Sequence, residues 1–366
     1  MSNQRYAWIC FFCCSLVPAL AQQNGPTGLS ERPATAPPAS ANRSIALDVV
    51  VSDKSGKPVS GLQQQDFTIL DNKKPRRIES FHAVDGGAST TADPAEVILF
   101  LDEVNTPFAE AAIEQQEIEA FLKKSATQLP GPTSIILLRQ LGAVLGATSS
   151  RDANALIAAL NQGRSGQLVT GKQIEAYGLD GWQQLSLYTL DQLAGYEATR
   201  PGRKLLVWIS PGWPLLRTDL SADDPDEGLN TKEQKEMFGT IVALSVKLRQ
   251  ARMTIYDIDP SGLADANQLR TSDYKQFEKG VKSANQVQVG SLGLQVLADQ
   301  TGGRVLNSSN DMSGEISKCL ADARGYYVVS FDAPAGDGPN EYHALEIKVD
   351  KPGLTARSRT GYYAQP

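Results

Sequence analysis

Residues 97–102 read Val-Ile-Leu-Phe-Leu-Asp, five apolar residues in a row followed by an aspartate. A strand with one face in solvent alternates apolar and polar residues, so an uninterrupted apolar run indicates a strand covered on both faces. Three further runs of this kind follow, at residues 135–138, 205–209 and 253–256. Together they predict a central, largely parallel sheet with helices on both sides.

Helical periodicity separates these strands. Three segments carry apolar residues that mark one face of a helix: Ile118, Phe121, Leu122 and Leu129 in the first, Ile241, Leu244, Val246 and Leu248 in the second, and Leu294, Leu297 and Ala298 in the third. Gly302-Gly303 is expected to end the third helix. The alternation of strands and helices predicts a doubly wound α/β domain over residues 95–323.

The two ends of the folded chain have the character of β-structure. In residues 44–94, alternation along 45–51 indicates a strand with one buried face, and more strands are expected at 67–70 and 77–81 around a polar turn at 70–75. Residues 324–366 contain further strand-like runs. Neither segment has enough strands for a core of its own. We therefore predict one β-sandwich formed by both segments, with the α/β domain inserted between them.

The first residues indicate export. Arg5 precedes an apolar run, and Ala19-Leu20-Ala21 is a small-x-small cleavage pattern, so residues 1–21 are interpreted as a signal peptide cut after Ala21. An uncleaved membrane anchor is the alternative. Residues 22–43 are rich in Pro, Ala, Ser and Thr and are interpreted as a disordered linker. The sequence therefore predicts a secreted or periplasmic protein without a transmembrane segment in the mature chain.

Composition narrows the class of protein further. Cleavage would leave Cys319 alone of the 4 cysteines, so the mature fold would rest on its core without internal disulfides. The formal net charge is −6 and becomes more negative when Arg5 is lost, and no basic cluster offsets it. We therefore expect no nucleic-acid partner.

Connections that leave the strands are long, at residues 210–230 and 259–289, whereas connections that enter strands, such as 129–133, are short. Ligands of open α/β sheets bind at the carboxyl ends of the strands, so long loops there suggest a binding face. The alternative is that these loops are insertions that the fold tolerates.

Short motifs occur in a characteristic order along the chain. They are Val50-Val51-Ser52-Asp53 with Gly56-Lys57-Pro58-Val59, Asp66-Phe67-Thr68-Ile69, Leu101-Asp102 with Asn105-Thr106-Pro107, Pro201-Gly202-Arg203-Lys204, Leu297-Ala298 with Thr301-Gly302-Gly303, Tyr326-Tyr327, and Gly361-Tyr362-Tyr363. On these residues the sheet domain resembles a von Willebrand factor type A domain, and the chain after the linker resembles the acidobacterial "VWFA-related" exported family. The resemblance implies a von Willebrand A-like fold that binds a protein ligand, but fold likeness alone does not give a function.

Type A domains typically hold a divalent cation through Asp-x-Ser-x-Ser after the first strand, a Thr from a later loop and an Asp after the fourth strand. Here Asp102 matches, Thr106 can replace the last Ser, and Asn105 is a third candidate ligand. Val104 offers no oxygen at the first Ser position, and Ser210-Pro211-Gly212 stands where the family usually has an acidic residue. The resemblance therefore implies a degenerate site, with at most weak Mg²⁺ or Mn²⁺ binding. Alternatively, Asp102 and Thr106 only accept hydrogen bonds from loop N–H groups.

Catalytic arrangements are harder to find. The two histidines, His82 and His343, lie in the β segments, away from the expected ligand edge. Asp102 and Glu103 are adjacent, so their side chains are expected to point to opposite faces and not to converge on a substrate.

Ser210 follows a strand and invites comparison with the nucleophile of a hydrolase. However, Trp208 stands where the tight turn of such an enzyme needs a glycine, and Pro211 lacks the N–H that an oxyanion hole requires.

Two functional hypotheses follow. The first is an exported, non-enzymatic binding, adhesion or scaffold protein that holds a protein or glycan partner at the loop face. Its candidate contact residues are Asp102, Thr106, Ser210, Trp213 and Asp259. The alternative is an exported hydrolase whose catalytic residues are not recognisable from the sequence.

Overall fold

The structure is a computed structural model, and it describes residues 44–85, 95–125, 129, 131–139, 142–145, 149–164, 179–213, 229–260 and 274–364. The predicted signal peptide and linker lie outside these residues. In the part of the chain that is described, no helix is long and apolar enough to cross a membrane.

A six-stranded sheet forms the centre of the α/β domain, in the order β10-β9-β8-β5-β6-β7. Its strands are β5 (Glu96–Asp102), β6 (Thr133–Arg139), β7 (Gly142–Leu145), β8 (Lys204–Ile209), β9 (Met253–Ile258) and β10 (Val305–Leu306). Every neighbouring pair is parallel except β6 and β7. The four apolar runs are β5, β6, β8 and β9, so the predicted sheet, parallel apart from one edge strand, is confirmed.

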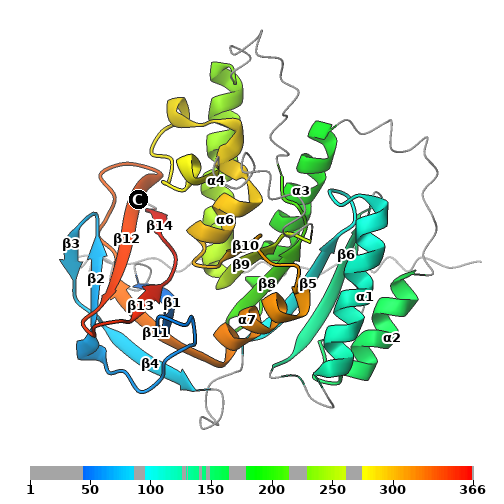
Figure 1. The fold of residues 1–366 in the computed structure, drawn as a ribbon. Helices are drawn as coiled ribbons and strands as arrows, with labels where there is room; N and C mark the ends of the chain where they lie inside the picture. Colours follow the sequence, from blue (N-terminus) through cyan, green and yellow to red (C-terminus); the bar gives the residue numbers. More distant parts are fainter. Residues whose placement is uncertain are drawn as a thin grey trace, which may run out of the picture. The chain divides into compact units, whose positions relative to one another are not determined.

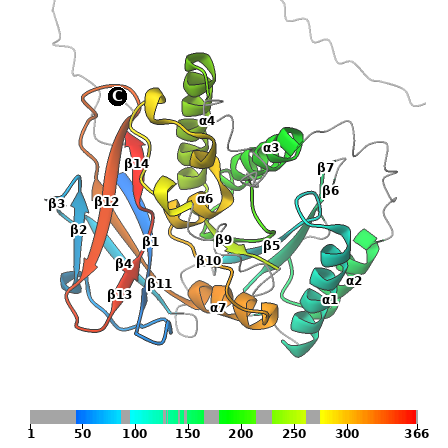
Figure 2. The ribbon, with the colours of Figure 1, turned by 45° about the horizontal axis from the view of Figure 1, so that its top comes forward.

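Helices cover both faces of this sheet, as Figure 2 shows. The first core packs α1 (Phe108–Lys124), α2 (Ala153–Arg164) and α7 (Met312–Arg324) against Val97, Leu99 and Leu101 of β5. The second core packs α3 (Leu179–Glu197), α4 (Thr231–Gln250) and α6 (Leu294–Gln300) against Ile98 and Phe100 of the same strand. Because alternate residues of β5 enter opposite cores, every position from Val97 to Leu101 has to be apolar.

Local signals set the helix ends. The side chain of Asn230 accepts hydrogen bonds from the N–H groups of Lys232 and Glu233, which caps α4 at its amino end. After α6, Gly302 has a φ of 85°, and the Gly303 N–H donates to the carbonyl of Ala298. A side chain at Gly303 would collide with the backbone of β9, so the glycine pair both ends the helix and admits the strand.

Two four-stranded sheets combine strands from both ends of the chain, in the orders β13-β1-β11-β4 and β14-β12-β2-β3. Their strands are β1 (Ser44–Ser52), β2 (Phe67–Asp71), β3 (Lys74–Arg76), β4 (Ser80–Asp85), β11 (Gly325–Asp332), β12 (Glu341–Val349), β13 (Thr355–Arg357) and β14 (Gly361–Ala364). Blue and red strands therefore lie side by side in Figure 1. A third core contains residues of both sheets, among them Leu47, Ile69, Phe331 and Leu345.

The turn expected at residues 70–75 is shorter in the structure. Asn72 and Lys73 have φ values of 48° and 65°, so β2 and β3 are joined by a two-residue hairpin turn. The strand expected at 77–81 begins only at Ser80, because Lys74–Arg76 already pairs with β2 as β3.

The long connection after β9 is not a bare loop in its described part. It contains the short 3-10 helices η2 (Tyr274–Phe277), η3 (Ala284–Gln286) and η4 (Val289–Leu292). Val281, Val287 and Leu292 are buried in the second core. Residues 259–289 were expected to be a binding loop or a tolerated insertion, and the described part of this segment in addition contributes Val281 and Val287 to the core.

Candidate functional site

The carboxyl edge of the sheet is the candidate site. Strand order reverses between β5 and β8, which are neighbours at the centre of the sheet although β6 and β7 lie between them in the chain. Ligands of doubly wound sheets bind at such a switch point. Asp102 is the last residue of β5, and Ser210 follows β8, so both stand at this position.

Asp102 is fully buried and is surrounded by hydrogen-bond donors. Its Oδ1 accepts from the backbone N–H groups of Val104 at 3.1 Å and Asn105 at 3.0 Å. Its Oδ2 accepts from Asn105 Nδ2 at 2.7 Å, from Trp208 Nε1 at 3.0 Å and from the Ser186 hydroxyl at 3.5 Å. Burial raises the pKa of Asp102, and the hydrogen bonds from Asn105, Trp208 and Val104 oppose that shift.

A second buried carboxyl lies close to Asp102. Glu114, on α1, is 1 % exposed, and neither of its carboxyl oxygens has a hydrogen bond to a described residue. The Thr106 hydroxyl is also buried, and it lies beside Glu114 outside hydrogen-bond geometry. Burial raises the pKa of Glu114 to about 8, and the negative charge of Asp102 adds to this effect. Glu114 is therefore mostly protonated at neutral pH.

Glu103 turns away from Asp102, as alternation along the strand predicts. Its carboxylate pairs with Arg139 of β6 at 2.7 Å and accepts a hydrogen bond from Gln115 of α1. The two adjacent carboxylates do not converge on one ligand.

The other predicted contact residues are largely inside the protein. Ser210 is fully buried, and its hydroxyl accepts from the Gly212 N–H at 3.0 Å. Trp213 is 1 % exposed and packs edge-on against Trp208, with ring centroids 4.6 Å apart. Asp259 is half-buried, and its N–H donates to Leu306 of β10. The side chains of Ser210 and Trp213, like those of Asp102 and Thr106, are thus not surface contacts in this structure.

These contacts show whether the candidate ligand atoms of the predicted metal site are free to bind a cation. Both oxygens of Asp102 already accept hydrogen bonds from protein groups, and the Asn105 side-chain nitrogen donates to Asp102 and lies 2.8 Å from the Ser186 hydroxyl. Across the described ranges, no group of three or more His, Cys, Asp or Glu side chains is placed to hold a metal ion. Asp102, Asn105 and Thr106 therefore fit a hydrogen-bonded loop better than a strong divalent-cation site.

Asp257, near the end of β9, also stands at this edge and was not singled out from the sequence. It is fully buried, and burial raises its pKa well above the ordinary value, with the charge of Asp259 adding to the effect. Gln295 of α6 donates to its Oδ2 at 2.9 Å, whereas its Oδ1 has no hydrogen bond. Because Gln295 also reaches the carbonyl of Pro211 at 3.4 Å, it links the ends of β8 and β9.

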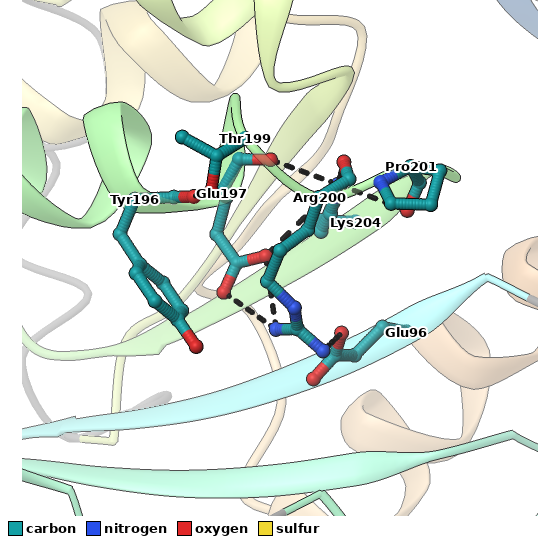
Figure 3. Close-up of polar contacts among 7 residues, drawn as sticks. All are labelled: Glu96, Tyr196, Glu197, Thr199, Arg200, Pro201 and Lys204. Atoms are coloured by element: carbon teal, nitrogen blue, oxygen red, sulfur yellow. Dashed lines mark hydrogen bonds and ion pairs between the residues drawn. The ribbon is translucent and has the colours of Figure 1, made fainter.

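The opposite, amino edge of the sheet carries the ion-pair cluster shown in Figure 3. Arg200, just after α3, bridges Glu197 at 3.0 Å and Glu96 of β5 at 2.8 Å. Lys204 of β8 is 1 % exposed, and its ammonium donates to the carbonyls of Glu197 at 3.0 Å, of Arg200, and of Pro201 at 3.2 Å. Burial lowers the pKa of Lys204, and Glu197 opposes that shift. These contacts tie α3 to the sheet.

Exposed apolar side chains are found on the two helices that flank the switch point. Phe108, the first residue of α1, is 81 % exposed and lies directly after the Asp102 loop. On α3, Tyr188 is 63 % exposed, two residues from the Ser186 that contacts Asp102, whereas Tyr196 is 60 % exposed beside the amino-edge cluster. Phe108 therefore places an exposed aromatic ring at the carboxyl edge.

The fold and the site define the class of protein as a doubly wound α/β protein with a buried polar centre at its switch point. No family model and no curated protein matches the chain. Among solved structures it is similar to a von Willebrand factor type A protein from Catenulispora acidiphila, at 9 % identity and a TM-score of 0.31, over 88 % of this chain and 75 % of that one. It is also similar to the SpRpn10 VWA domain, at 12 % identity and a TM-score of 0.22, over 50 % of this chain and 95 % of that one.

Proposed function

We propose that this chain is an exported, non-enzymatic binding or scaffold protein that holds a protein or glycan partner at the carboxyl edge of its sheet. The motif resemblance to exported von Willebrand A-like proteins supports this proposal, as does the signal-peptide pattern of residues 1–21. In the same proposal, the two four-stranded sheets act as one β-sandwich that carries the α/β domain as an insertion.

The exposed Phe108 carries the proposal. An aromatic ring that is 81 % exposed is unfavourable in water and is typical of contact residues in protein interfaces. Its neighbour Asp102 is satisfied by internal hydrogen bonds, which fixes the loop that leads into α1. The binding face is therefore a rigid loop and helix start that presents an apolar contact, and recognition there does not depend on a metal ion.

Affinity capture tests this function, with an aromatic at the opposite edge as a matched control. The immobilised protein is incubated with envelope extract, and captured proteins and glycans are quantified for wild type, Phe108→Ser and Tyr196→Ser. We expect specific capture that falls at least tenfold with Phe108→Ser and stays unchanged with Tyr196→Ser. Equal capture by both variants, or no specific capture by the wild type, would contradict the proposal.

One observation favours the alternative, an exported hydrolase. Glu114 has a pKa raised to about 8 by burial and lies near Asp102, and perturbed carboxyl groups are common in active sites. Glu114 is 1 % exposed, so a substrate would reach it only after α1 or its neighbours move, and for this reason the hydrolase ranks second. Screening ester, peptide and glycoside substrates with wild type and Glu114→Gln would reveal such an activity.

A further inference from the structure

A cluster of three arginines lies away from the switch point, between β1 and the start of β9. Arg249 is in the last turn of α4, Arg252 follows that helix, and Arg359 lies in the link between β13 and β14. All three line one open cavity, whose free space is about 290 Å³ with the solvent at its mouth included. Ala46, Asp48 and Thr254 line the same cavity.

The positive charges in this cavity exceed the negative ones. Among the described residues of the lining, Asp48 is the one carboxylate, and it pairs with Arg252, whose Nε lies 3.3 Å from the Asp48 Oδ2. Within the described part of the chain, the guanidinium groups of Arg249 and Arg359 have neither a hydrogen bond nor an ion pair. Two guanidinium groups thus face one cavity without an acceptor among the described protein groups.

The electrostatics of this cavity favours an anion. Burial lowers the pKa of Arg359 to about 10, and the neighbouring charge of Arg249 lowers it further, while Asp48 opposes the shift. Burial also lowers the pKa of Arg249. Both side chains are half-buried, and an anion in the cavity would offset the loss of hydration and the mutual repulsion of the two guanidinium groups.

We propose that the cavity formed by Arg249, Arg252 and Arg359 binds an oxyanion, with Arg249 and Arg359 donating to its oxygens. Planar guanidinium groups match the oxygens of phosphate, sulfate and carboxylate groups through paired N–H donors. The bound anion joins α4 to the β13–β14 link, and it therefore fastens the α/β domain to the strands of the chain ends.

A second cavity adjoins the first. It shares Arg359 and Thr301 with the first cavity and is lined on its other side by Leu248, Tyr342 and Tyr363. The apolar and aromatic lining suits a ring or a hydrocarbon group attached to the anion. The oxyanion is either a free ion or the anionic group of an organic molecule. Comparing the affinity of an anion that carries a ring with that of the free ion distinguishes the two.

Titration with inorganic phosphate and with phenyl phosphate, at constant ionic strength, tests the proposal. Binding is measured by calorimetry and by the melting temperature for wild type, Arg249→Gln, Arg359→Gln and Arg77→Gln. Arg77 is a matched control because its side chain is 86 % exposed and lies outside the cavity lining. We expect saturable phosphate binding that weakens about tenfold or more in Arg249→Gln and Arg359→Gln and is unchanged in Arg77→Gln.

The titrations with phosphate and with phenyl phosphate give separate outcomes. Tighter binding of phenyl phosphate than of phosphate identifies an organic anion as the ligand class, and equal binding identifies the free ion. Arg249→Gln keeps the test decisive if Arg359→Gln does not fold, because Arg249 is a half-buried helix residue whose side chain has no hydrogen bond or ion pair with a described residue. Absence of saturable binding in the wild type, or equal binding by Arg249→Gln and wild type, overturns the proposal.

Discussion

Replacing Glu114 with glutamine should change how the stability of the protein depends on pH. The carboxyl group is 1 % exposed, and burial raises its pKa from 4.5 to about 8. Between these two pH values the folded protein keeps a proton that the unfolded chain releases. The free energy of unfolding therefore falls as the pH rises through this window, and the stabilisation is fully present only below the unfolded-state pKa.

The size of the effect follows from the two pKa values. They differ by about 3.5, and each unit corresponds to about 1.4 kcal/mol, so the wild type loses at most about 5 kcal/mol between pH 4 and pH 9. Glutamine has nearly the same shape and cannot ionise, so this loss is absent in Glu114→Gln. The unpaired amide of glutamine costs about 1 kcal/mol at every pH. We expect the variant to be slightly less stable at pH 5 and about 3–4 kcal/mol more stable at pH 9.

Urea denaturation followed by tryptophan fluorescence, at pH values from 5 to 9, measures this difference. Glu236→Gln is the control, because Glu236 is on α4 and its side chain is 67 % exposed. Its free energy of unfolding should follow that of the wild type at every pH. Other titrating groups cancel in the comparison of Glu114→Gln with the wild type. If the two curves run parallel from pH 5 to pH 9, Glu114 is not held protonated by burial and the reasoning fails.

Three further predictions concern other parts of the fold. Lys204→Met should lower the free energy of unfolding by about 3 kcal/mol in the same urea assay, because three carbonyls lose their donor and Glu197 stays buried. The control is Lys232→Met at an exposed position, which should change the free energy of unfolding by less than about 0.5 kcal/mol. Calorimetric titration of the wild type with Mg²⁺, Mn²⁺ and Ca²⁺ should give dissociation constants of about 1 mM or weaker, and micromolar binding that disappears in Asp102→Ala would show an intact metal site. Limited proteolysis should give no stable fragment of residues 325–366, because the strands of this segment pair with β1, β2 and β4. A folded fragment of that length would contradict the shared sheets.

The central sheet was predictable because its signal is local. Each residue from Val97 to Leu101 of β5 faces a core, so this run is apolar whatever the rest of the chain does. The glycine pair after α6 was predictable for a similar reason, because a left-handed residue at a helix end is set within one turn.

The candidate site was predictable only in part. Asp102 was identified from its place at a strand end, but its contacts with Ser186 and Trp208 join residues 84 and 106 positions away, for which the sequence has no local signal. Trp213 was named as a candidate contact residue of the loop face, and the structure buries it against Trp208.

Glu114 had a usable signal that was missed. It lies on the stripe of α1 that includes Ala111 and Ile118, both buried, so a charged residue stood at a position expected to be inside the protein. The stripe predicts burial, but it does not predict that Asp102 lies nearby, because that depends on how the helix packs on the sheet.

The pairing of the chain ends has a consequence for biosynthesis. Tyr362 donates to Asp71, 291 residues earlier in the chain, at 3.2 Å. Strands β1 to β4 leave the ribosome first, but their partners β11 to β14 are translated last. At a translation rate of about 5–20 residues per second, the first strands wait on the order of 15–60 seconds with unpaired edges. A nascent chain of this kind is exposed to misassociation for most of its synthesis. A chaperone that covers open strand edges would protect it.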